Sequence, residues 1–191
     1  MDKSVIIKAA EGDVKSFRQI FDFYLPKMRP VCMRYCRTTH EADDILQEAF
    51  VKIFHNLKYF KFEGSFEGWI RKIVVNSALN AHKKNIKLEI FEPIDQLEDE
   101  GPDEEILPVL DDSEPDVLLK LLDQLPVGYK TVFNLYVLED FSHKEIGEML
   151  GISESSSRSQ YSKAKKFVKK LIAGQRNEEK SSLIGRRDQI D

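Results

Sequence analysis

Hydrophobic residues in the first ninety positions recur at steps of three and four, which is the spacing of one face of an α-helix. One run comprises Phe17, Ile20, Phe21, Tyr24, Met28 and Val31. A second run comprises Ala42, Ile45, Leu46, Ala49, Phe50, Ile53 and Leu57. Thr38 and Glu41 have the form S/T-x-x-E and predict a capping box at the start of this second helix. The stretch YFKFEGSFEGW then predicts a loop, because it combines two glycines with dense aromatics.

A third periodic stretch begins near Phe66, continues past Lys83 and predicts one more helix. Its predicted buried side comprises Ile70, Ile73, Val74, Ser77, Ala78 and Ala81. The pattern fails between Phe91 and Pro115, where four prolines and one glycine accompany many carboxylates. Such a segment cannot bury enough apolar surface to offset its ordering entropy, so we interpret it as a flexible linker. The alternative, an acidic loop inside one domain, would be a long structureless insertion.

Periodicity resumes at Asp116, and VLLKLLDQL predicts a short helix. Pro126 suits the first turn of the next helix, which is predicted to extend through Val137. Nothing in the sequence demands a β-strand. The chain is therefore predicted to be all-α, with two small helical domains joined by a flexible acidic linker. The predicted parts are residues 1–90, the linker 91–115, a helix-turn-helix domain 116–173, and a polar, frayed tail 174–191.

The helix-turn-helix is predicted from the segment that begins at Ser142. Ser142 and Glu145 predict a capping box, Gly151 ends that helix, and Ser153 can cap the last one, which is predicted to reach about Ile172. The last helix places Tyr161, Ala164, Val168 and Leu171 on one face. Its opposite face collects Ser156, Arg158, Ser159, Ser162, Lys163, Lys166, Lys169 and Lys170.

Hydroxyls and long cations on one helical face suit the major groove of DNA. Serine permits close approach, and arginine or lysine can reach base edges or phosphates. The alternative interpretation is a solvated, lysine-rich surface of an ordinary helical bundle. One further position, Ser157, is predicted to face inward and to bond a carbonyl one turn earlier.

The charge distribution changes how this segment is interpreted. The 191 residues carry a formal net charge of -4, and DNA repels a net anion. Residues 1–90 hold 16 Lys and Arg against 11 Asp and Glu, and residues 124–191 hold 12 against 9. Residues 91–123 hold 1 against 13. An acidic belt therefore separates two mildly basic ends, and the net charge of the whole chain describes neither end.

The stretch GWIRKIVVNSALNAHKK carries a second group of polar residues. Lys72, Asn76, Asn80 and Lys83 line its outer face, with Trp69 at the edge. Asparagine is a poor residue in the middle of a helix, so two of them one turn apart suggest a role beyond solubility. The preceding aromatics are Tyr59, Phe60, Phe62 and Phe66. Aromatic rings beside amides and cations suit the unstacked bases of single-stranded DNA, although most of these rings are also expected to fill part of a small core.

The stretch HEADDILQEAF projects Asp44, Gln47 and Glu48 together at helical spacing. Such residues usually form a solvated face, but an acidic patch could also dock a basic protein partner. The stretch lacks H-E-x-x-H and E-x-x-H spacing, and the chain has no P-loop or dinucleotide fingerprint. His55, His82 and His143 are isolated in the sequence. No catalytic residue, metal site or cofactor is predicted, and an enzyme is not expected.

The two cysteines, Cys32 and Cys36, lie four residues apart in a helical pattern and are predicted to face the same way. His40 extends the series to C-x3-C-x3-H, which raises the question of zinc. Three ligands along one helix cannot surround a tetrahedral ion without a fourth from elsewhere. We therefore interpret the cysteines as buried or half-buried structural thiols. No apolar run could span a bilayer, and the stretch MDKSVIIKAAEGD lacks the long apolar core and cleavage site of a secretory signal, so we expect a cytoplasmic protein.

In this order, the three groups of residues resemble the bacterial sigma factors of RNA polymerase, in particular the extracytoplasmic-function (ECF) group. The stretches EADDILQEAFVKIF, FEGSFEGWIRKIVVNSALN and LPVGYKTVFNLYVLEDFSHKEIGEMLGIS carry the resemblance, which covers residues 4–90 and 116–172. It implies a factor that binds core RNA polymerase, recognises the minus-ten and minus-thirty-five promoter elements and helps melt DNA. The acidic linker is similar to the family's segment that threads toward the RNA exit channel.

The resemblance also implies roles for individual residues and partners. The partners it implies are the clamp helices of the largest polymerase subunit, the flap of the second subunit, duplex and single-stranded promoter DNA, and an anti-sigma factor. Residues implied to contact polymerase are Asp44, Gln47, Glu48 and Phe54. Residues implied to contact the minus-ten element are Phe62, Ser65, Phe66, Trp69, Lys72, Asn76, Asn80 and Lys83. Residues implied to contact the minus-thirty-five element are Ser156, Arg158, Ser159, Ser162, Lys163 and Lys166.

Two departures from the family pattern bear on promoter sequence. Ser155, Ser156 and Ser157 stand where Gly-Thr-Val is commonest, and Lys163 stands where Arg is frequent but lacks its bidentate fork. The runner-up prediction is a stand-alone helix-turn-helix regulator that binds operators as a dimer. Such a regulator needs a dimerisation surface or a signal-receiving domain, and the first ninety residues show no phosphoacceptor βα pattern. An enzyme on a helical bundle, such as a metal-dependent hydrolase, is a distant third, against which the missing ligand spacing argues.

Overall fold

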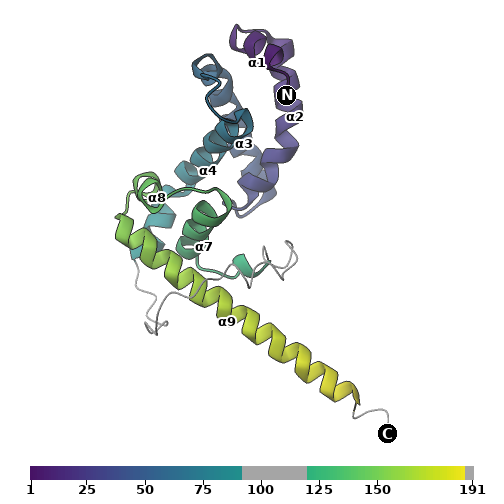
Figure 1. Cartoon of the computed structure of the whole chain (residues 1–191), viewed down its shortest axis with the longest axis vertical. Helices are drawn as coiled ribbons and strands as arrows, with labels where there is room; N and C mark the ends of the chain where they lie inside the picture. The colour runs from purple at the N-terminus through teal and green to yellow at the C-terminus, as the bar shows by residue number, and fades with distance from the viewer. Residues whose placement is uncertain (92–119, 188–191) are drawn as a thin grey trace. The chain divides into compact units, whose positions relative to one another are not determined.

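The computed structural model describes residues 1–91 and 120–187 (Figure 1). These residues form helices joined by short connections and include no β-strand, which confirms the all-α prediction. The chain divides into two compact units, Met1–Lys83 and Lys84–Asp191. The acidic linker predicted for residues 91–115 lies outside the described residues, apart from its first position. Among the described helices, none is both long and apolar enough to cross a membrane.

The first unit is built from helices that pack in sequence order. The elements are α1 (Lys3–Ala10), α2 (Val14–Met33), α3 (Thr39–Asn56), the short 3-10 helix η1 (Leu57–Tyr59) and α4 (Phe66–Phe91), of which the residues up to Lys83 belong to this unit. Helix α2 packs against both α1 and α3. Its hydrophobic run faces the core as predicted, with Ile20, Tyr24, Met28 and Val31 buried. The core is therefore formed by the periodic positions that the sequence indicates.

The start of α3 differs in one detail from the predicted capping box. The Thr38 hydroxyl accepts a hydrogen bond from the Glu41 backbone N–H at 3.2 Å, as predicted. The Glu41 carboxylate, however, accepts from the backbone N–H of Arg37 at 2.7 Å rather than from that of Thr38. The Glu41 side chain therefore satisfies a backbone donor one residue further from the helix than a capping box would.

Helix α4 buries a wider face than the sequence indicates. Ile70, Val74, Ser77 and Ala78 are buried as predicted. Ala81 is exposed, so its assignment to the buried side is wrong. Val75 and Leu79, which were not predicted to be buried, are 0% and 3% exposed. A helical wheel predicts one buried face from the spacing of hydrophobic residues. It therefore does not predict the burial of residues outside that face, such as Val75 and Leu79.

The second unit contains helical residues 120–122, α7 (Val127–Phe133), the π-helical turn η2 (Asn134–Leu138), α8 (His143–Leu150) and α9 (Glu154–Arg187). Helix α9 packs against both α7 and α8, and its Ala164 and Val168 enter a core with Phe133. Pro126 occupies the N-cap of α7 rather than its first turn. The predicted end of the last helix near residue 172 is wrong, because α9 continues as a helix to Arg187.

The connection between α8 and α9 has the geometry of a helix-turn-helix. Ser142 and Glu145 form both halves of the predicted capping box, and Gly151 ends α8 in the left-handed conformation with φ of 70°. A glycine is also required at Gly147, since a Cβ atom there would lie 2.9 Å from the Ile152 carbonyl oxygen. Glycine at both positions therefore permits a turn as tight as this one.

Candidate functional site

The outer face of α4 carries the polar residues that the sequence predicts. Lys72, Asn76, Asn80 and Lys83 are all exposed, and Trp69 is half-buried at the edge of the same stretch. Because the four residues recur at steps of three and four, the helix presents them on one side. Two amides between two lysines therefore offer hydrogen-bond donors and acceptors within a cationic surface.

The loop before α4 holds an aromatic cluster in which one residue has a strained backbone conformation. Phe66 is 9% exposed, and its ring centroid lies 5.0 Å from that of Phe60. Phe62 is 39% exposed and has a positive φ of 60°, which is rare for a bulky side chain. Strain of this kind concentrates at functional sites. Phe66 therefore serves the core, whereas Phe62 presents a ring to solvent.

A cation beside this ring was missed at the sequence level. The ammonium nitrogen of Lys3 lies 4.6 Å from the centroid of the Phe62 ring. Because Lys3 belongs to α1, fifty-nine residues earlier, no local spacing in the sequence could have revealed the contact. Only the packing of α1 against the loop brings the two residues together. The ring and the ammonium group together could bind a base and a phosphate.

Helix α3 exposes the predicted acidic face. Asp44, Gln47 and Glu48 are exposed on the side of α3 opposite its buried residues. Asp44 lies 3.1 Å from the His40 ring nitrogen, and both side chains are exposed. Phe54 is half-buried and packs edge-on against Phe17, with ring centroids 4.8 Å apart. The ring therefore contributes to the core as well as to the surface.

Helix α9 presents the predicted polar face beyond the turn. Arg158 and Ser159 are exposed, and Ser156, Ser162, Lys163 and Lys166 are half-buried. The guanidinium of Arg158 pairs with the Glu154 carboxylate at 2.6 Å, one turn earlier. Such an exposed pair contributes little to stability, so a phosphate or base edge can replace the carboxylate. The Arg158 side chain therefore lies beside Glu154 on the helix surface and remains exposed.

Beneath this face lies a buried polar pair that the sequence did not reveal. The Ser157 hydroxyl and His143 Nδ1 are 2.9 Å apart, and both residues are buried. The prediction that Ser157 bonds a carbonyl one turn earlier is therefore wrong. His143 is isolated in the sequence but not in the fold, since its ring stacks on Tyr136 with centroids 4.3 Å apart. The pair joins α8 to α9 and fixes the rotation of α9 about its axis.

This pair makes the stability of the second unit depend on pH. Burial lowers the pKa of His143 below its ordinary value of 6.5, and the positive charges of Arg158 and Lys165 add to that effect against Glu154. The unfolded chain therefore binds the proton more readily, so the stabilisation is present above pH 6.5 and is lost as pH falls through the folded-state pKa.

We expect the melting temperature of the variant His143→Gln to fall less steeply than that of the wild type as the pH is lowered below 6.5. Thermal unfolding of the wild type, the variant and a His55→Gln control, which changes an exposed histidine, would be compared below pH 7. An unchanged slope in the His143 variant would contradict the assignment.

The cysteines are not arranged along one helix. Helix α2 ends at Met33, so Cys36 lies in the connection to α3, although the two sulfur atoms are 3.8 Å apart as the predicted orientation requires. Both thiols are free. The hydrogen bond between them, together with burial, raises the pKa of Cys32, and the same bond lowers the pKa of Cys36.

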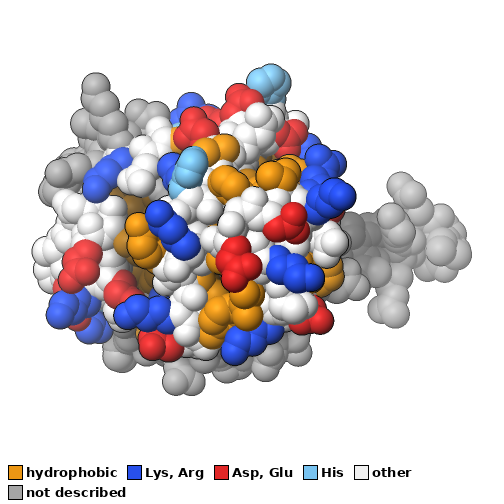
Figure 2. All heavy atoms as spheres, turned by 90° about the horizontal axis from the view of Figure 1, so that it is seen from above, with side chains coloured by type: hydrophobic (Ala, Val, Ile, Leu, Met, Phe, Trp, Pro, Cys, Tyr) orange, Lys and Arg blue, Asp and Glu red, His pale blue; other side chains and the backbone are white. Residues whose placement is uncertain are grey.

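The face of the molecule drawn in Figure 2 carries mixed charge. On the face drawn in Figure 2, basic and acidic side chains alternate, and hydrophobic atoms lie between them. A surface of this kind does not attract DNA through a broad positive field. DNA contact on this face would therefore depend on local groups rather than on a broad positive field.

Comparison with known proteins identifies the family. The family description "Sigma-70 region 2" matches residues 20–87, and "Sigma-70, region 4" matches residues 116–168. Together they span more than half of the chain, and they contain the exposed faces of α3, α4 and α9 described above.

Curated relatives and one solved structure match over nearly the whole length. "ECF RNA polymerase sigma factor SigW" of Bacillus subtilis is 28% identical, with 90% of this chain and 97% of the relative covered. "ECF RNA polymerase sigma-E factor" of Haemophilus influenzae is 26% identical, with 90% and 95% covered. The fold is similar to that in "Structure of CnrH in complex with the cytosolic domain of CnrY", with a TM-score of 0.51 and 18% identity, covering 91% of this chain and 97% of that one.

The chain therefore belongs to the sigma-70 family of RNA polymerase initiation factors, within its ECF group. As such it is a non-enzymatic factor that binds RNA polymerase and DNA, recognises promoters and serves transcription initiation. The predicted fold class, family and general function are thus confirmed.

Proposed function

We propose that this sigma factor recognises a promoter through two separate local surfaces, which are α4 with its preceding loop and α9. The observation that carries the proposal is the exposed row of Lys72, Asn76, Asn80 and Lys83 on α4, together with the exposed ring of Phe62 in the preceding loop, whose backbone has a positive φ. This surface combines amides, cations and an accessible aromatic ring. It is suited to an unstacked base, which can stack on the ring and bond to the amides.

At the minus-ten element, Asn76 is proposed to bond the edge of a flipped base. Lys72 and Lys83, which are both exposed, would pair with phosphates on either side of it, and Lys3, which lies over the Phe62 ring, would add a further cation. Capture of a flipped base favours the melted state, because the unstacking cost of a few kcal/mol is then offset by stacking and hydrogen bonds. Recognition and melting would therefore be one event. Ser65, which directly precedes α4, is exposed and would approach the same strand.

At the minus-thirty-five element, α9 is proposed to enter the major groove. Arg158 and Lys163 would reach base edges, while Ser159, Ser162 and Lys166 would bond phosphates or bases at short range. The buried pair of Ser157 and His143 supports this role, because it sets which side of α9 faces outward.

Polymerase docking is proposed for the acidic face of α3. Asp44, Gln47 and Glu48 would contact the clamp helices of the largest subunit, with Phe54 contributing apolar contact at the margin. The helix-turn-helix domain would contact the flap of the second subunit. An anti-sigma factor that covers these same faces is a further proposed partner class, and the expected place of action is the bacterial cytoplasm, at the nucleoid.

The uneven charge of the chain is consistent with DNA contact at two separate surfaces and with docking on polymerase. The free protein neutralises few phosphates and carries an acidic belt, so it is expected to bind duplex DNA weakly. Loading onto polymerase would align both DNA-binding surfaces and shield the belt within a positively lined channel. A stand-alone regulator, the runner-up function, would instead bind its duplex site without polymerase.

The variant Arg158→Ala tests this proposal at the minus-thirty-five element. Loss of a base contact costs about 1–3 kcal/mol, so we expect about a tenfold loss of promoter affinity in the polymerase complex. Footprinting with and without core polymerase gives the measurement. The matched control is Arg18→Ala, since Arg18 is also exposed and pairs with an acid, Asp22, one turn away. Tight, specific footprints by the free protein would favour the stand-alone regulator.

A further inference from the structure

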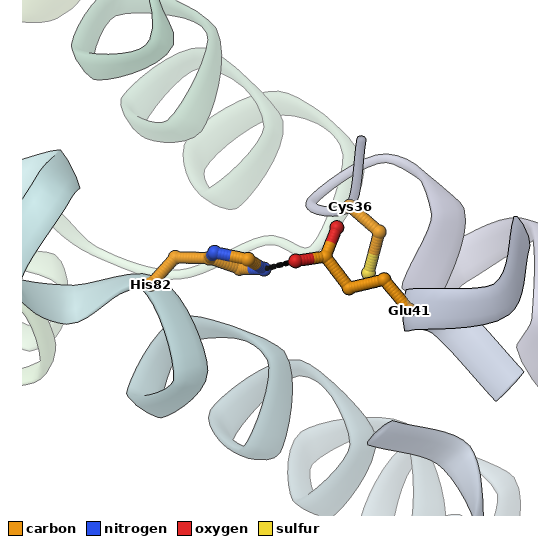
Figure 3. Close-up of side chains that lie close together, drawn as sticks. All are labelled: Cys36, Glu41 and His82. Atoms are coloured by element: carbon orange, nitrogen blue, oxygen red, sulfur yellow. Dashed lines mark ion pairs between the residues drawn. The ribbon is translucent and has the colours of Figure 1, made fainter. Parts of the chain in front are cut away.

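Three potential metal ligands meet where α4 passes the start of α3. The sulfur of Cys36, a carboxylate oxygen of Glu41 and a ring nitrogen of His82 all lie within 4.8 Å of one another. Figure 3 shows the imidazole of His82 directed at the Glu41 carboxylate, with the Cys36 side chain beside that carboxylate. The three residues come from the α2–α3 connection, α3 and α4, and all are half-buried. His82 is isolated in the sequence, but the fold brings Cys36 and Glu41 beside it.

The distances suit a tetrahedral ion. His82 Nε2 and Glu41 Oε1 are 3.4 Å apart. A zinc ion with bonds of about 2.0–2.1 Å to nitrogen and oxygen would place those two atoms about 3.3–3.4 Å apart. The sulfur lies close enough that a small rotation of the Cys36 side chain could complete a three-ligand set. A water molecule would then occupy the fourth position, as in zinc sites with three protein ligands.

The polar atoms around the cluster support this arrangement. The Arg37 backbone N–H donates to Glu41 Oε2 at 2.7 Å and leaves Oε1 directed at His82. Hydrogen bonds of this kind orient ligands in metal sites. The Nε2 atom of His82 is buried and, apart from its 3.4 Å ion-pair contact with Glu41, has no hydrogen-bond partner among the described residues. An ion between the three groups would satisfy that nitrogen.

The charges also balance for a divalent ion. A thiolate and a carboxylate together neutralise two positive charges, and a neutral imidazole adds none. The half-buried site would therefore carry no net charge once it is filled, which limits the desolvation cost. Thiolate and imidazole ligands favour zinc over magnesium or calcium.

We propose that Cys36, Glu41 and His82 bind one zinc ion that ties α4 to the start of α3. His82 follows Asn76 and Asn80 along α4, and Glu41 precedes Asp44 along α3. The ion would thus brace the helix that carries the α4 polar face against the helix that carries the acidic face. This proposal does not depend on the promoter elements that the factor recognises.

The test measures metal binding by the full chain without polymerase. Zinc at about ten times its Kd should raise the melting temperature by at least about 4 °C. Cobalt in place of zinc should give the near-ultraviolet absorption of a thiolate-bound ion. We expect His82→Ala, and separately Cys36→Ser, to weaken zinc binding about a hundredfold, with the cobalt band lost in the cysteine variant.

The control is His40→Ala, because His40 is the histidine of the C-x3-C-x3-H series but is exposed and pairs with Asp44 instead. This variant should retain zinc with unchanged affinity. The conservative variant Glu41→Gln keeps the size of the side chain and covers the case in which His82→Ala fails to fold. Equal loss in the His40 and His82 variants, zinc binding that survives Glu41→Gln unchanged, or no zinc-dependent stabilisation of the wild type would overturn the proposal.

Discussion

The variant Asn76→Ala is expected to reduce promoter-dependent transcription about a hundredfold while leaving the fold intact. Asn76 is exposed in the middle of α4, so its removal leaves no cavity and no buried partner unsatisfied. Its proposed contact is made only to a base taken out of the stack, so the loss falls on the melted complex. Abortive initiation on linear promoter DNA with reconstituted holoenzyme would measure this effect.

A premelted template separates base capture from general damage to the protein. On DNA mismatched over the minus-ten element, part of the unstacking cost is already met, so the defect of Asn76→Ala should shrink. The control is Gln19→Ala, which removes an exposed amide from α2, outside the proposed surfaces. An Asn76 variant with wild-type activity on duplex promoters would remove this residue from the mechanism.

Reversal of charge at Asp44 and Glu48 together is expected to abolish holoenzyme assembly at physiological salt. The variant Asp44→Lys with Glu48→Lys replaces two attractive contacts by repulsion, which should lower affinity for core polymerase about a hundredfold or more. Both residues are exposed on α3, so the fold should be retained. Competition for core polymerase against the wild-type factor would measure the loss.

The salt dependence of this defect adds a second readout. Ionic screening weakens both the attraction in the wild type and the repulsion in the variant, so the difference between them should narrow as salt rises. The matched control, Glu11→Lys with Asp22→Lys, makes the same change in net charge at two exposed acids of the first unit. If the control lost core binding equally, net charge rather than the acidic face of α3 would govern docking.

Local signals account for most of what the sequence predicted correctly. The hydrophobic periods of α2 and α3 and the capping box of Ser142 with Glu145 depend on residues within one or two turns. The family resemblance added the promoter and polymerase roles, which residue types alone left open. The exposed faces of α3 and α4 then followed from the buried ones, because a helix that buries one side presents the other.

Contacts between distant segments account for what the sequence did not predict. His143 and Ser157 are fourteen residues apart, and His82 lies forty-one residues beyond Glu41, so only tertiary packing brings each pair together. The left-handed φ of Phe62 was equally hidden, since glycine and not phenylalanine marks that conformation in a sequence. The extension of α9 was missed because polar composition suggested fraying, although many of its residues favour helix.

The most direct test of the central claim is transcription in a purified system. The factor would be added to core polymerase from the same source with fragmented genomic DNA, and the transcripts sequenced. The account predicts discrete start sites that require the factor, share two upstream elements and vanish with Asn76→Ala or Arg158→Ala. It would be contradicted if no core-dependent transcripts were found while the free protein still bound specific duplex sites.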